Sequence, residues 1–156
     1  MLLSLSAALL ALPAVSQAAG KSSHRSSSEH QVLRLLNDIR RQHGLSTLTA
    51  STQLRNAARS HSDDMIRHHY FDHDSPSEAW DVRVRRYMNS SLVGEDIAWG
   101  TGSYGSPEGI VSLWMHSAPH RHVILMSDMH HVGLGISSGT FDGTPGAVMA
   151  TADFSA

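Results

Sequence analysis

Apolar positions recur every three or four residues in several stretches of the chain, and this spacing predicts helices. The predicted helices are residues 29–44, a stretch capped by Ser51 or Thr52, residues 76–88 with Pro76 in the first turn, residues 107–117, and a short helix after Pro119. In the second of these helices, His61 falls on the apolar face beside Leu54, Ala58 and Met65. We therefore interpret His61 as a core histidine with a hydrogen-bond partner.

Three other stretches lack the helical period and predict strands. They are residues 91–100, 130–138 and 146–154. The last two are separated by a loop that contains Asp142–Gly143, a dipeptide that favours a tight hairpin turn. Helices that precede a mixture of helix and strand predict an α+β layered domain.

The N-terminal region differs in composition from the rest. Residues 1–18 combine a short apolar run with a small-residue pattern that ends at Ala18, which predicts a secretory signal peptide rather than a membrane span. Residues 19–28 are serine-rich and predict a flexible leader, so the folded domain is expected over residues 29–156. These features predict a protein that is secreted or periplasmic after signal-peptide removal.

Charge and composition exclude some classes of protein. The chain of 156 residues has a formal net charge of −2, which argues against a nucleic-acid binder, and it has no cysteine, which excludes disulfides and a lipoprotein anchor. It carries 12 histidines, so stability or association is expected to change between about pH 7 and pH 5 as they protonate.

One motif suggests a nucleotide. Residues 100–105 match the spacing G-x-G-x-x-G between a predicted strand and a predicted helix. Fewer than thirty residues follow Asp128, the candidate ribose-binding acid, and they are too few for a second set of βαβ units. No nucleotide cofactor is expected.

Seven motifs, taken in order, resemble the bacterial, cysteine-free branch of the CAP superfamily, which includes cysteine-rich secretory proteins, antigen 5 and pathogenesis-related proteins. They are LLNDIRRQHGLSTLTAS, LRNAARSHSDDM, YFDHDSP, GEDIAWG, LWMHSAPHRHVIL, HHVGLGIS and ATADF, which together span about residues 30 to 154. The resemblance implies a three-layer α-β-α sandwich with a small central antiparallel sheet and a cleft on one side.

The resemblance also implies which residues line that cleft. The two histidines of the family pattern match His73 and His120, and the acid of its G-E-N motif matches Glu95. Pro119 is expected to end the preceding helix and to let His120 start the next segment facing the cleft. For the same reason His116 and His120 are not expected to form a pair on one helix face.

This chain departs from the pattern at three positions. Ser117 stands where eukaryotic members have a second glutamate, Asp96 replaces the asparagine after Glu95, and Val123 replaces an asparagine of the H-R-x-N-I-L motif. The resemblance implies a divalent ion such as zinc for some members, and here its ligands would be His73 and His120 with Glu95. No local spacing between the two histidines supports that site independently.

Two classes of function follow from these residues. The favoured one is a secreted, non-enzymatic binding or effector protein whose partner is a lipid, a small molecule or a protein. The alternative is a metal-dependent, protease-like hydrolase that uses the same cleft, with Glu95 as the base. Ser117, His120 and Glu95 are also the residue types of a serine triad, but no nucleophile-elbow motif surrounds Ser117.

The three tryptophans, Trp80, Trp99 and Trp114, are expected in the core or the cleft wall.

Overall fold

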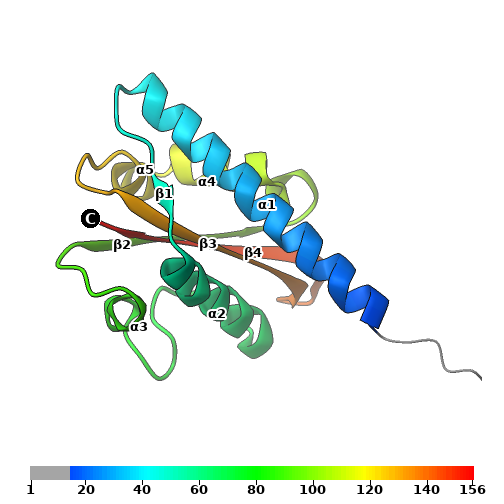
Figure 1. The fold of residues 1–156 in the computed structure, drawn as a ribbon. Coiled ribbons are helices and arrows are strands. Elements are labelled where there is room, and N and C mark those ends of the chain that lie inside the picture. The colour runs from blue at the N-terminus through cyan, green and yellow to red at the C-terminus, as the bar shows by residue number, and fades with distance from the viewer. Residues whose placement is uncertain (1–14) are drawn as a thin grey trace, which may run out of the picture.

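The structure is a computed structural model that describes residues 15–156. Within this range the helices are α1 (Val15–Gln42), α2 (Thr52–His68), α3 (Trp80–Tyr87), α4 (Pro107–His116), α5 (Ala118–Ile124) and the 3-10 helix η1 (Gly102–Gly105). The strands are β1 (Thr49–Ala50), β2 (Val93–Gly100), β3 (His131–Phe141) and β4 (Thr144–Ser155). Figure 1 shows the elements in order along the chain.

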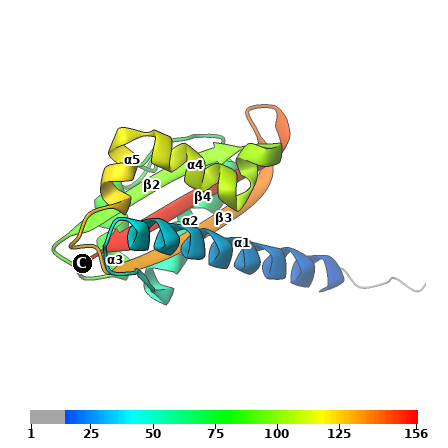
Figure 2. The same ribbon diagram turned by 90° about the horizontal axis from the view of Figure 1, so that it is seen from above.

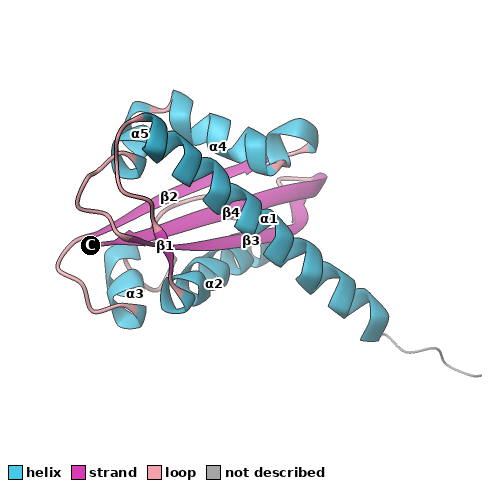
Figure 3. Ribbon diagram, turned by 45° about the horizontal axis from the view of Figure 1, so that its top comes forward, coloured by secondary structure: helices cyan, strands magenta, loops and turns pink. Residues whose placement is uncertain are grey.

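A single sheet of four strands lies between two helical layers. The strand order is β1-β3-β4-β2, and all pairs are antiparallel except β1 with β3. Helices α2 and α3 cover one face of the sheet, and α1, α4 and α5 cover the other (Figure 3). The predicted α-β-α sandwich is confirmed, with one short parallel strand added at the edge of the sheet.

The hairpin between β3 and β4 turns at the predicted dipeptide. Asp142 and Gly143 have φ values of 47° and 72°. Positive φ at both central residues is the geometry of a type I′ turn, whose twist matches that of the two flanking strands. The turn pairs Phe141 with Thr144, and a register shift between Gly139 and Thr140 then brings Gly133 opposite Asp153.

Helix α2 packs directly on the backbone of β3. A Cβ atom added at Gly133 would lie 2.0 Å from backbone atoms of Leu54 and Arg55, and one added at Gly135 would lie 2.2 Å from the carbonyl carbon of Ala58. A backbone contact this close is open only to glycine. The hydroxyl of Ser62 closes the same interface by donating to the carbonyl oxygen of Gly135 at 2.9 Å.

The largest apolar cluster lies on the opposite face of the sheet. Its fully buried members come from α1, α4, α5 and the strands, and include Leu36, Ile110, Trp114 and Phe154. Seen from above, α4 and α5 lie over β2, while α1 runs beside them (Figure 2). This layer therefore fixes the position of α5 relative to β2.

Residues 19–28, expected as a flexible leader, are part of α1 in the structure. Side chains of this segment bond to α2: Arg25 donates to Asp63 at 3.1 Å, and Arg59 donates to Ser26 at 3.2 Å. Because these contacts are tertiary, serine-rich composition did not indicate them. The predicted signal peptide falls mainly on residues 1–14, which lie outside the described residues, and it stays a prediction.

Two helix boundaries also differ from expectation. The third helix begins at Trp80 rather than at Pro76, because Ser75 and Glu78 form a turn and Asp74 accepts a hydrogen bond from the Trp80 N–H at 2.9 Å. Helix α4 ends at His116, before Pro119, which occupies the first turn of α5. No helix within residues 15–156 is long and apolar enough to cross a membrane.

Candidate functional site

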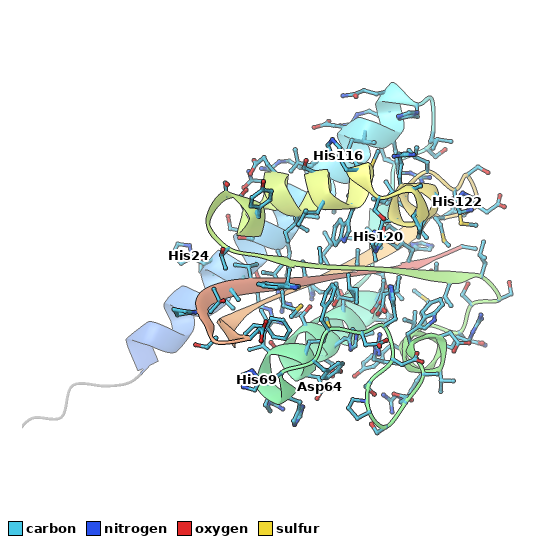
Figure 4. The ribbon with its side chains drawn as sticks, turned by 180° about the vertical axis from the view of Figure 1, so that it is seen from behind. His24, Asp64, His69, His116, His120 and His122 are labelled. Atoms are coloured by element: carbon cyan, nitrogen blue, oxygen red, sulfur yellow. The ribbon has the colours of Figure 1, made fainter. Side chains whose placement is uncertain are left out.

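The candidate site lies along the open edge of β2, the strand at one side of the sheet. His73 reaches this edge from the loop after α2, and His120 reaches it from α5, on the opposite face of the sheet. The two imidazole rings have centroids 6.4 Å apart and planes inclined by 33°. Figure 4 shows His120 on the side of α5 that faces β2, with His122 further out.

Glu95 of β2 holds His73 in place. Its Oε1 lies 2.8 Å from Nδ1 of His73, and its Oε2 accepts a charge-assisted hydrogen bond from Arg83 of α3. Arg83 also donates to the carbonyl oxygen of His73 at 3.1 Å. The side chains of Glu95 and Arg83 are 0% and 4% exposed. The network fixes Nδ1 of His73 on Glu95 and leaves Nε2 as its free ring nitrogen.

The same contacts shift the pKa values of the site. The hydrogen bond to Glu95 raises the pKa of His73 above its usual value. Burial lowers the pKa of His120, and the neighbouring His73 lowers it further. The pKa of Glu95 is held below its usual value by His73 and Arg83, against the opposing effect of burial. The two histidines therefore differ: His73 is the one that readily carries a positive charge.

Two more carboxyl groups are buried beside Glu95, and sequence reasoning missed one of them. Asp153 pairs with Glu95 across the β2–β4 ladder, and burial, with the charge of Glu95, raises its pKa well above the usual range. Within the described residues neither carboxyl oxygen of Asp153 has a hydrogen-bond partner, so Asp153 is buried beside Glu95 without being bonded to it. The signal was present in the sequence, because Asp153 interrupts an otherwise small and apolar run, Ala150–Phe154.

Asp96 faces the apolar layer on the other side of β2 and is 0% exposed. Within the part of the chain that the structure describes, neither of its carboxyl oxygens has a hydrogen-bond partner. Burial, together with the charge of Glu95, raises the pKa of Asp96 to about 8. The aspartate that replaces the asparagine of the family pattern therefore places a protonated acid directly behind the site.

Arg83 carries no comparable signal in the sequence. It lies in a run of alternating charged and apolar residues, DVRVRRYM, in which any of three arginines would be read as solvated. Only the placement of α3 against β2 makes Arg83 the buried partner of Glu95.

Ser117 does not act with His120 in a triad. Among the described residues its hydroxyl bonds to no histidine, and its backbone instead caps the junction between α4 and α5. His116 is directed away from the pair, with Nδ1 2.8 Å from the carbonyl oxygen of Ser112. His61, as expected, is a core residue: it is 1% exposed, and its Nε2 lies 3.0 Å from the carbonyl oxygen of Asp72.

Two cavities lie end to end along the edge of β2. The first, of about 500 Å³, contains His73, Glu95 and Trp80, with two further acids, Asp72 and Asp74, at its rim. The second, of about 280 Å³, contains His120 and Ser117, and the rest of its lining is apolar. His73 lines the first cavity and His120 the second, and their ring centroids are 6.4 Å apart.

The donor atoms do not fit the metal site expected with Glu95 as a ligand. Both Glu95 oxygens are engaged by His73 and Arg83, and the Arg83 charge lies next to them. No group of three or more His, Cys, Asp or Glu side chains among the described residues is arranged to hold a metal ion. The protein offers an ion two imidazoles, with Glu95 behind one of them.

Comparison with known proteins agrees with this fold. Residues 33–154 match the cysteine-rich secretory protein family, the CAP family, and the chain belongs to it. Two Bacillus subtilis proteins are similar in sequence. The uncharacterized protein YkwD is 36% identical over 118 residues, and the uncharacterized membrane protein YlbC is 33% identical over 114 residues. These matches cover 74% and 72% of this chain but only 45% and 32% of the relatives, so the chain spans less than half the length of either.

Solved structures show the same fold. An extracellular SCP-domain protein of Bacillus anthracis superposes with a TM-score of 0.68 at 29% identity, over 83% of this chain and 40% of that one. An outer surface protein of Borrelia burgdorferi superposes with a TM-score of 0.70 at 16% identity, over 82% of this chain and 91% of that one. The second likeness concerns the fold alone.

Proposed function

We propose that this CAP domain is a non-enzymatic extracellular binding protein whose ligand occupies the cleft along the edge of β2. The observation that carries the proposal is the histidine pair. His73 and His120 come from opposite sides of the sheet and present their rings to one another across the junction of two cavities. The similarity to a Bacillus anthracis protein described as extracellular supports the location.

Binding is favoured over hydrolysis by the arrangement of the polar groups. Glu95, the expected base, is fully buried and already bonded on both oxygens, so it cannot take a proton from a water molecule in the cleft. Among the residues that the structure describes, no histidine is hydrogen-bonded to Ser117 to activate it. The contacts of Glu95 therefore position His73 and leave no free oxygen for reaction.

A divalent ion held by the two imidazoles is the second candidate ligand. It is favoured by the Glu95–His73 contact, because a carboxylate on Nδ1 orients an imidazole for coordination through Nε2. Two protein ligands leave the remaining coordination positions to water or to a bound molecule.

The proposal is tested by nuclear magnetic resonance of the domain labelled with 15N in its histidine rings. Three probes are titrated separately: zinc chloride, sodium myristate and an acetylated pentapeptide that ends in an apolar residue. Saturable shifts of the His73 and His120 ring signals with any probe support a binding cleft. Shifts should persist in His122→Ala, because this side chain is exposed on α5 and lies outside both cavities.

The variants His73→Ala and His120→Ala are the counterparts of the His122→Ala control, because each removes one imidazole from the cleft. A probe that binds the wild-type protein should bind each of them at least about tenfold more weakly, the effect of one lost charge-assisted contact. If none of the three probes shifts either ring, the cleft is not a binding site of this kind and the proposal is wrong. Casein hydrolysis abolished by Glu95→Gln would establish the enzymatic alternative instead.

A further inference from the structure

The outer edge of β2 presents backbone groups that no other strand uses. The N–H of Ala156 donates to the carbonyl oxygen of Leu92, which shows that Leu92 points toward β4. In an antiparallel ladder, alternate residues point toward and away from the partner strand. The backbone groups of Val93, Glu95, Ile97 and Trp99 therefore point away from β4, toward the open edge.

These edge groups have no protein partner. Across residues 15–156, no backbone or side-chain group hydrogen-bonds to the N–H or C=O of Ile97 or Trp99. Ile97, although only 4% exposed, lines the smaller cavity together with Trp99. Unpaired strand edges of this kind accept an added extended chain, and the main-chain hydrogen bonds then supply affinity.

The smaller cavity lies across this part of the edge. Its walls come from both faces of the sheet: Phe71 from the loop after α2, and Leu113 and Trp114 from α4. Phe71 and Leu113 remain 43% and 36% exposed, although both are large apolar side chains. The cavity volume of about 280 Å³ is large enough for one leucine or aromatic side chain.

Charge divides the cleft at the histidine pair. The lining of the smaller cavity contains no acidic residue, whereas Asp72, Asp74 and Glu95 line the larger one. At the end of the smaller cavity stands His120 and, across from it, His73, whose Nδ1 is held by Glu95 at 2.8 Å so that Nε2 is its free ring nitrogen. The 6.4 Å between the ring centroids leaves no room for a strand to pass between them. An occupant of the smaller cavity therefore has to end at the imidazoles, and a negative end is favoured there.

We propose that the cleft captures the C-terminal segment of an extended peptide, with an apolar last side chain in the smaller cavity and the α-carboxylate on His73 and His120. The peptide runs antiparallel to β2 and pairs with the backbone of Ile97 and Trp99. This inference rests on the proposed binding function and names the ligand class of the same site. The imidazoles would recognise the carboxylate at the chain end, and the strand edge would recognise the backbone before it. The cleft should therefore accept many peptide sequences, provided that the last residue is apolar.

The test uses the domain in buffer with EDTA, so that no metal bridges the carboxylate. The probes are acetyl-Ser-Val-Thr-Val-Leu with a free carboxylate and the same peptide as its C-terminal amide. Calorimetry should give a dissociation constant at least about tenfold lower for the carboxylate form. Leu113→Asp, which places a negative charge beside the bound apolar side chain, should weaken binding by at least a similar factor, and His122→Ala should not change it. Phe71→Ser gives the same test on the opposite wall if Leu113→Asp does not fold.

Hydrogen exchange supplies the independent measurement. Amide exchange at Ile97 and Trp99 should slow on saturation, while the amides of Asp96 and Ala98, which already face β4, should not change. Equal affinity for the amide form, or unchanged exchange at Ile97 and Trp99, would overturn the peptide proposal. If myristate or zinc shifts the histidine rings and the peptide does not bind, the binding cleft stands and the peptide inference fails. If no probe binds, both fail.

Discussion

On the face of the sheet covered by α2 and α3, the buried residues of β2 and β4 include Glu95, Thr151 and Asp153. On the face covered by α1, α4 and α5, the same two strands bury Ala98, Ala150, Ala152 and Phe154, and Asp96 is their one charged residue. Both faces are closed to solvent, but the first combines hydrogen bonds with a smaller apolar cluster, whereas the second is held mainly by apolar packing.

The difference has a physical consequence for the site. Buried polar groups must find hydrogen-bond partners. The hydrogen bonds from Arg83 to Glu95 and between Glu95 and His73 meet this requirement in one geometry, and they fix the Nε2 atom of His73 at the cleft. Apolar packing is non-directional, so the opposite face contributes stability and carries α5, with His120, to within reach. Orientation thus comes from one face and most of the stability from the other.

The largest expected effect comes from opening the apolar face. Phe154→Ala removes a fully buried ring and should lower the free energy of unfolding by about 3–5 kcal/mol. Thr151→Val, an almost isosteric change on the polar face, removes one hydrogen bond to Ser62 and should cost about 1–2 kcal/mol. Urea denaturation of both variants measures the two values. A larger loss in Thr151→Val would reverse the assignment of stability to the apolar face.

The next effect comes from breaking the polar network. Arg83→Met leaves the buried Glu95 carboxylate without its cation and should destabilise the protein by about 3 kcal/mol. The double variant Arg83→Met/Glu95→Leu should recover most of this loss, since apolar side chains then replace both charges. The double variant should nevertheless lose ligand binding, because Nδ1 of His73 has lost its anchor. Recovery of stability together with wild-type binding would show that the network does not orient His73.

Asp96, the ionisable residue that β2 buries on the apolar face, gives a pH-dependent effect. In the unfolded chain Asp96 ionises near pH 4, whereas in the folded protein its pKa is about 8. Between these values the folded state binds one more proton than the unfolded state. The free energy of unfolding therefore falls as pH rises, by about 1.4 kcal/mol per unit from this group.

Asp96→Asn should remove that dependence. The free energy of unfolding of the variant, relative to that of the wild-type protein, should therefore rise steadily from pH 5 to pH 8. Chemical denaturation at four pH values in this range gives the slope directly. Asp128→Asn, at an exposed position, is the control and should run parallel to wild type. Parallel curves for Asp96→Asn would mean that Asp96 is ionised in the folded protein.

The smallest effect is expected outside both layers. Val82 of α3 is 53% exposed, two positions from the fully buried Val84. Val82→Ser should change the free energy of unfolding by less than about 0.5 kcal/mol and leave peptide binding unaltered. A melting curve displaced by several degrees would indicate that this side of α3 packs against something besides the described chain.

The elements that follow a local rule were predicted from the sequence. The helical spacing of apolar residues located α2 and α4, and Ser51 caps α2 by accepting from the Leu54 N–H at 3.3 Å. Asp142–Gly143 located the hairpin. Family motifs placed His73, Glu95 and His120, and the structure brings all three to one edge of β2. Composition did not indicate that residues 19–28 join α1 and contact α2, and the helical period did not indicate the local turn at Ser75–Glu78 that moves the start of α3 to Trp80.

The sequence by itself determined the periods, caps and turns of the elements, because these depend on residues a few positions apart. Only the tertiary structure decided which arginine is buried, since Arg83, Arg85 and Arg86 are equivalent until α3 meets β2. It also decided that Glu95 bonds to His73 and Arg83 with its two oxygens, and that within residues 15–156 the backbone of Ile97 and Trp99 has no partner. Such properties arise between segments far apart in the chain, where burial and the choice of partner set the energy of each charge and each hydrogen bond.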